Sequence, residues 1–246
     1  MITNLKTFET DYIDNLMDTQ NDIQFDNQVD TQTEPKTDSE IEPGFPFGRK
    51  IIILESNWDI ENTFNNISVY PFLSNISPIL GNKHPIQVGH RNFDSLRGLK
   101  FYTQFPSGKI WNDPSCWGTS VFYIGSHGGT TSILPTMDVI RQTGMIDSFK
   151  GFESYPNIIY FGGCGIFNGE KGDNFGWDLV GSSGTRCVVG FKSHDVGFLD
   201  SIVIDILFLT RFFGVDDSFN RLTEIYESIL YDFPPSRDLG FSMYLR

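Results

Sequence analysis

Two short stretches decide the fold expected for this chain: VFYIGSHGG at residues 121–129 and IIYFGGCG at residues 158–165. In each, aromatic and β-branched residues end in glycine, a pattern typical of strands covered on both faces, as in a parallel sheet. The first leads into His127 and the second into Cys164, 37 positions later, which leaves room for one crossover helix. We therefore expect both side chains at the carboxyl edge of one sheet, where open α/β sheets bind ligands.

Apolar runs and helix-like segments alternate along the rest of the chain. Further strands are expected at 50–55, 86–88 and 187–191, a small β piece at 133–134 and an edge strand at 240–245; helices are expected near 66–80, 94–103, 137–149, 175–182, 199–213 and 217–231; and residues 165–174, rich in Gly, Asn and Asp, are expected to form a loop. This alternation predicts an α/β fold with a mostly parallel, doubly wound sheet and helices on both faces. For such a sheet we take the strand order 2-1-3-4-5.

Charge and composition separate residues 1–45 from the domain expected at 46–246. Residues 1–43 hold 11 Asp and Glu against 2 Lys, which gives −9 of the total net charge of −13. Apolar clusters are sparse in this leader, so it cannot bury enough surface to offset the entropy of ordering, and we expect it to be disordered.

Removal of residues 1–43 should leave the rest of the protein folded, because the leader offers few apolar anchors. The expected result is a melting temperature within about 2 °C of that of the full chain, measured by circular dichroism. A large fall after truncation would show that the leader belongs to the core.

The remaining composition narrows the class of protein. Three cysteines without CxxC spacing argue against a disulfide scaffold and a zinc site and favour a reducing, cytoplasmic compartment. No signal-peptide pattern opens the chain, and the apolar stretch 198–213 contains charges and is too short to span a bilayer. No basic patch suggests nucleic acid as a partner.

The glycines beside Cys164 and His127 favour a chemical role over a packing role. Glycines on both sides of Cys164 leave the sulfur accessible, and the two after His127 let the backbone approach a substrate. A free thiol is mostly protonated at neutral pH, so a nearby imidazole that takes its proton activates it. The other cysteines, Cys116 and Cys187, are interpreted as packing residues, and the other histidines, His84, His90 and His194, as surface or loop residues.

Two carboxylates are candidates for binding substrate beside this pair. Glu55 ends the first strand and Asp195 follows the strand at 187–191, so the strand order places them on opposite sides of the pair. A solvated cluster that begins a helix is an equally open interpretation of Glu55. Lys192 is the contrary charge, and its long side chain can turn to solvent.

The layout resembles the caspase-like cysteine peptidases of clan CD, and most closely the bacterial CHAT-domain proteases. In that family a His-Gly dipeptide closes the third strand and a Gly-Cys or Ala-Cys dipeptide closes the fourth, as His127-Gly128 and Gly163-Cys164 do here. The CVVGF run at 187–191 is similar to a strand of the bacterial members. The resemblance covers residues 48–213 and more loosely the rest to 246. The chain has neither the Asp-x-Cys sequence that surrounds the cysteine of metacaspases nor the Gln-Ala-Cys sequence of animal caspases. The resemblance therefore leaves the cleavage preference open.

The resemblance implies a three-layer, flavodoxin-like fold and hydrolysis of peptide bonds through an acyl-enzyme. Cys164 would be the nucleophile, His127 its acid–base partner, and the amides of Gly128 and Cys164 the oxyanion hole. No metal or organic cofactor is implied. The expected partners are a protein or peptide substrate and a regulatory protein, in bacterial stress or defence signalling. Two alternatives stay open: a catalytically silent interaction module of the same fold, and a thiol hydrolase of small amides or esters.

Overall fold

The computed structural model describes residues 50–56, 87–104, 119–135, 139–150, 158–183, 185–214 and 220–246. The chain divides into two units, residues 1–44 and 45–246, and all of the described residues belong to the second. The expected leader, the helix expected near 66–80, Cys116 and His84 therefore lie outside the described residues.

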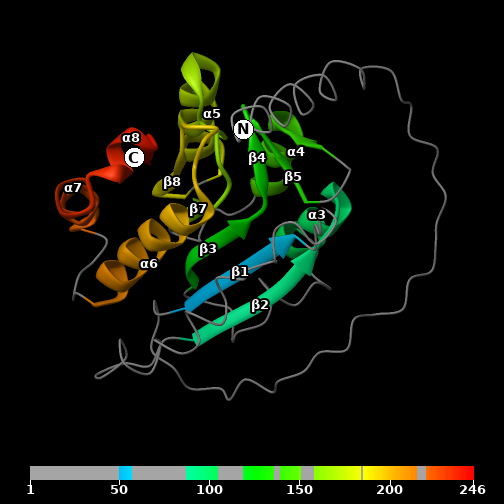
Figure 1. Cartoon of the computed structure of the whole chain (residues 1–246). Coiled ribbons are helices and arrows are strands. Elements are labelled where there is room, and N and C mark those ends of the chain that lie inside the picture. The colour runs from blue at the N-terminus through cyan, green and yellow to red at the C-terminus, as the bar shows by residue number, and fades with distance from the viewer. Residues whose placement is uncertain are drawn as a thin grey trace. The chain divides into compact units, whose positions relative to one another are not determined.

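The described elements alternate between strands and helices over much of the chain (Figure 1). In chain order they are β1 (Lys50–Ser56), β2 (Gln87–Phe93), α3 (Leu96–Gln104), β3 (Thr119–Gly125), β4 (His127–Gly129), β5 (Ser132–Leu134), β6 (Ile140–Arg141), α4 (Gln142–Phe149), β7 (Ile158–Phe161), α5 (Gly169–Ser182), β8 (Cys187–Phe191), α6 (Phe198–Gly214), α7 (Leu222–Asp232), α8 (Pro235–Asp238) and β9 (Phe241–Leu245).

Six of the described strands form one sheet in the order β2-β1-β3-β7-β8-β9. Neighbouring strands are parallel except β9, which runs antiparallel to β8 at the edge. Figure 1 shows β1, β2 and β3 side by side with their arrowheads pointing the same way. Numbered along the chain, the five parallel strands follow the order 2-1-3-4-5. The expected strand order, the mixed α/β class and the edge strand at the end of the chain are confirmed, and the structure adds that this edge strand is antiparallel.

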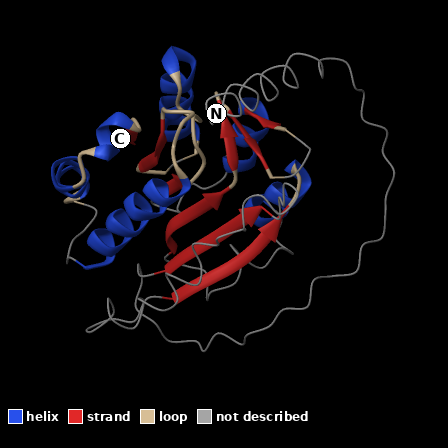
Figure 2. Cartoon of the chain, in the orientation of Figure 1, coloured by secondary structure: helices blue, strands red, loops and turns tan. Residues whose placement is uncertain are grey.

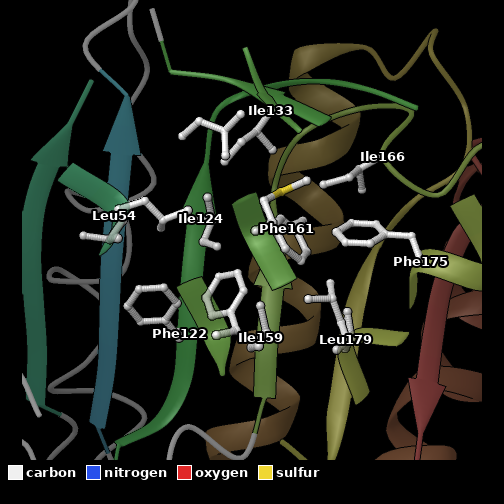
Figure 3. Close-up of a cluster of buried hydrophobic side chains, with 14 of the residues drawn as sticks. Leu54, Phe122, Ile124, Ile133, Ile159, Phe161, Ile166, Phe175 and Leu179 are labelled. Carbon is white, nitrogen blue, oxygen red and sulfur yellow. The ribbon is translucent and has the colours of Figure 1, made fainter. Parts of the chain in front are cut away.

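Helices cover both faces of the sheet, which explains why its strands are apolar at consecutive positions. Phe122 and Phe161 point to the face that carries α3, α4 and α5, within the buried cluster drawn in Figure 3. Their neighbours Tyr123 and Tyr160 point to the opposite face, against α6 and α7. Figure 2 shows α6 on one side of the strands and α3 and α4 on the other. A strand whose two faces are both buried needs no polar residues, because each successive side chain points into one apolar layer or the other.

The chain between the end of β3 and the start of β7 forms a second, three-stranded sheet. It consists of β4, β5 and β6, paired antiparallel, with the β4–β5 turn at residues 130–131. The expected β piece at 133–134 is confirmed. The helix expected over 137–149 is shorter, because Ile140 pairs with Ile133 as part of β6 and is buried there, so that α4 begins at Gln142.

Two expected boundaries are wrong. The loop expected at 165–174 is largely helix, because α5 begins at Gly169. Its glycines serve close packing: a β-carbon at Gly172 would overlap the backbone of Phe167, and one at Gly176 would overlap the ring of Tyr244. The strand expected at 86–88 extends to Phe93, since among the described strands β2 lies at the edge of the sheet and pairs with β1 alone, a position that tolerates polar residues.

A carboxylate is buried beneath the strands that lead to His127 and Cys164. Asp205 of α6 is fully buried and accepts hydrogen bonds from the hydroxyls of Tyr123 (2.7 Å) and Tyr160 (2.5 Å). The two tyrosine rings stack, with centroids 5.3 Å apart. Burial raises the pKa of Asp205 to about 7, although both hydrogen bonds act to lower it. The network ties α6 to the two central strands.

Within the part of the chain that the structure describes, no helix combines the length and the apolar character needed to cross a membrane.

Candidate functional site

The ends of β3 and β7 lie side by side and carry the two residues singled out above. The strands pair in register up to Ile124 and Phe161, and the Gly162 amide donates to the Ile124 carbonyl at 2.9 Å. His127 and Cys164 each lie three residues beyond the last pair. The structure therefore brings both residues to the carboxyl edge of the sheet, while their chemical roles stay predictions.

Glycines allow the two strand ends to touch. A β-carbon at Gly128 would overlap the carbonyl oxygen of Cys164 and would lie 3.3 Å from the Cys164 amide nitrogen. A β-carbon at Gly163 would lie 3.3 Å from the Gly128 amide nitrogen. These glycines serve the approach of one backbone segment to the other, and they place the amides of Gly128 and Cys164, the expected oxyanion-hole donors, in neighbouring positions.

The two described cysteines differ in exposure. Cys164 carries a half-buried thiol in the turn that follows β7. Cys187 is fully buried in β8, where burial raises the pKa of its thiol well above the ordinary value. A thiol held protonated in an apolar core is a poor nucleophile. The interpretation of Cys187 as a packing residue is thus supported, and Cys164 is the accessible thiol of the two.

Glu55 lies on β1, the neighbour of the strand that leads to His127, and its carboxylate is already hydrogen-bonded. It pairs with Gly125 in the β1–β3 register, two residues before His127. Its Oε2 lies 2.9 Å from Nε2 of His90, which donates to it from β2. His90 was expected on the surface or in a loop; it lies on β2 with 27% of its side chain exposed, so the structure contradicts only the loop alternative.

Asp195 lies in the segment between β8 and α6. It is exposed, and its backbone amide donates to the Ser193 hydroxyl at 3.1 Å. Lys192 in the same segment, whose side chain is long enough to turn to solvent, has its Nζ 2.6 Å from Oδ1 of Asp173 on α5. Hydrogen bonds from Lys192 and from the Tyr244 hydroxyl lower the pKa of Asp173. The charge of Lys192 is thereby compensated at α5.

His194, which the sequence analysis interpreted as a surface or loop residue, lies in the loop after β8 and reaches the Cys164 loop. His194, one residue before Asp195, is half-buried, and its Nε2 lies 2.6 Å from Nδ2 of Asn168. Its ring also lies against Gly165, the residue after Cys164. Its position after β8, beside the strand that ends in Cys164, was the signal that could have identified it.

No group of three or more His, Cys, Asp or Glu residues within the described ranges is arranged to hold a metal ion. A scan of the chain against models of protein families finds no match, and a search of curated proteins finds none either.

Proposed function

We propose that this protein is a cysteine endopeptidase of the caspase-like type, most similar to bacterial CHAT-domain proteases, acting on a protein or peptide. The observation that carries the proposal is the contact between the two strand ends, which places the residues after His127 and around Cys164 against each other. The mostly parallel sheet with helices packed on both faces supports the three-layer form of this fold.

The proposed reaction uses only groups of the chain and one water. His127 takes the proton of the Cys164 thiol as the sulfur attacks the carbonyl carbon of the scissile peptide. The resulting oxyanion accepts hydrogen bonds from the amides of Gly128 and Cys164, and one such donor is generally worth about 3–4 kcal/mol in the transition state. The carbon–nitrogen bond then breaks, and the amine leaves with the proton from His127.

The second half of the reaction regenerates the thiol. Water attacks the thioester carbonyl while His127 accepts a proton from it, and the carbon–sulfur bond breaks. The Cys164 sulfur leaves as a thiolate and recovers its proton from His127. The first half of the reaction releases the carboxyl-terminal fragment of the substrate as a free amine, and the second half releases the amino-terminal fragment as a carboxylic acid.

A peptide library and a peptidyl electrophile test this proposal together. The full-length protein should cleave members of the library, and the electrophile should form a covalent adduct that mass spectrometry locates on Cys164. Adduct formation without peptide cleavage would favour a thiol hydrolase of small amides or esters. Neither cleavage nor an adduct would favour the silent interaction module.

The carboxylates beside the site predict a preference for Arg or Lys on the amino-terminal side of the cut. A partly desolvated carboxylate holds such a side chain through charge-assisted hydrogen bonds of about 1.5–3 kcal/mol each. Since Glu55 is paired with His90 and Asp195 is exposed, we expect the lower end of this range, about tenfold in kcat/KM. Matched peptides that differ only at this position measure the preference.

Glu55→Gln and Asp195→Asn should each lower this preference, whereas Asp238→Asn, an exposed change on α8, should not alter it. Faster cleavage after Asp than after Arg or Lys would refute the predicted preference.

A further inference from the structure

The described loops that follow β4, β7 and β8 meet at the side chain of His194. Nε2 of this histidine lies 2.6 Å from Nδ2 of Asn168 and 3.4 Å from Oγ1 of Thr130. Thr130 follows β4, which begins at His127, and Asn168 immediately precedes α5. We propose that His194 is a positioning residue that fixes the loop carrying Cys164 against the turn that follows His127.

The contact with Gly165 shows how closely the ring and the loop are fitted. Gly165 has a φ of 68°, a left-handed conformation that favours glycine. A β-carbon at this position would overlap Nδ1 of His194 and would lie 2.9 Å from its Cγ. The imidazole therefore lies against the backbone of the residue that directly follows Cys164, and a shift of the ring requires a shift of this turn.

Backbone hydrogen bonds join the same three loops. The Thr131 amide donates to the Ile166 carbonyl at 3.0 Å, and the Phe167 amide donates to the Phe191 carbonyl at 3.1 Å. Within the loop, the Asn168 amide donates to the Gly165 carbonyl at 3.0 Å. His194 adds side-chain contacts to Asn168, in the loop after β7, and to Thr130, in the turn after β4. A planar ring with nitrogens on opposite sides suits a position between Gly165 and the Asn168–Thr130 pair.

This arrangement makes His194 distinct from the proposed acid–base residue. Its Nε2 is engaged by Asn168 and its Nδ1 faces Gly165, so it holds the loop instead of carrying the proton in the reaction. A displacement of reacting atoms by about 1 Å can cost about 100-fold in rate. The kinetic part of the inference rests on the proposed peptidase function, and it predicts an effect on kcat with little effect on KM.

Substitutions at both ends of the hydrogen bond test the kinetic part. His194→Ala should lower kcat by about 10- to 100-fold while KM stays within about threefold. His194→Gln, which can still bond to Asn168, should recover at least fivefold of the loss in kcat. Asn168→Ala combined with His194→Ala should cost no more than His194→Ala alone, because the two residues act through one contact. Ser182→Ala, at the other end of α5, is the matched control and should leave kcat unchanged.

Hydrogen exchange of backbone amides tests the positioning independently of peptidase activity. In His194→Ala the amides of Thr131, Phe167 and Asn168 should exchange about tenfold faster. The Phe233 amide, which follows α7 and donates to the Ile229 carbonyl within that helix, should keep its exchange rate. Unchanged exchange at all three amides would overturn the inference, and so would a rise in KM with an unchanged kcat. If the wild-type protein cleaves no peptide, the proposed function fails, and the exchange rates alone decide whether His194 positions the loop.

Discussion

Cys164→Ala should abolish peptide hydrolysis, with a loss in kcat on the order of 10⁴-fold or more. The variant has no sulfur to form the acyl-enzyme, and an alanine in this half-buried turn leaves the packing nearly unchanged. The measurement is the initial rate on the best peptide of the library, with the melting temperature of each variant as a check of folding. Cys187→Ala is the matched control, since this thiol is buried in β8 and should not affect turnover by more than a few-fold.

His127→Ala should cause a loss of similar size, and the double variant should lose no more than either single variant. Residues that act as one unit in a reaction give such non-additive losses. The His127→Ala variant keeps its thiol, so iodoacetamide should still label Cys164, but more slowly than in the wild-type protein. A Cys164→Ala variant with normal turnover would refute the proposed nucleophile, and strictly additive losses would refute a shared step.

The central strands could be predicted from the sequence because both of their faces are buried. Positions such as Phe122 and Tyr123 point to opposite faces, and each meets a layer of helices, so the whole run is apolar. The glycines that end β3 and β7 marked where the strands stop. The equal spacing of His127 and Cys164 beyond the last strand pair then followed from a parallel register. Local pattern was sufficient here because it reflects the environment of every residue in the run.

The features that the sequence did not predict, the start of α5 and the partners of His90 and His194, depend on contacts made in the tertiary fold, and for the two histidines these join residues far apart in the chain. Gly169 and Gly172 of α5 were interpreted as loop residues, since the sequence does not show that Phe167 approaches Gly172 closely. The partners of His90 and His194 are likewise set by the tertiary fold: Glu55 lies 35 residues from the former and Asn168 lies 26 from the latter. A polar residue in a short segment carries no sign of such a partner.

Asp205→Asn should remove a large pH-dependent contribution to stability. The folded-state pKa of about 7 is raised above the unfolded value, so the folded protein keeps this proton between about pH 4 and pH 7 while the unfolded chain loses it. The contribution is therefore fully present below about pH 4 and is lost as the pH rises through about 7. The difference between the two pKa values corresponds to about 4 kcal/mol in the free energy of unfolding.

An asparagine imitates the protonated acid, because its amide can accept a hydrogen bond from one tyrosine hydroxyl and donate one to the other. The variant should thus match the wild-type protein near pH 4.5 and exceed it in stability by several kcal/mol at pH 8, as measured by urea unfolding at each pH. Asp200→Asn, a partly exposed change on the same helix, should alter the pH dependence by less than about 1 kcal/mol. Parallel stability curves for Asp205→Asn and the wild-type protein would mean that the buried carboxylate stays ionised in the folded state. In that case the hydroxyls of Tyr123 and Tyr160 would compensate its charge in full, and Asp205 would not keep the proton expected here.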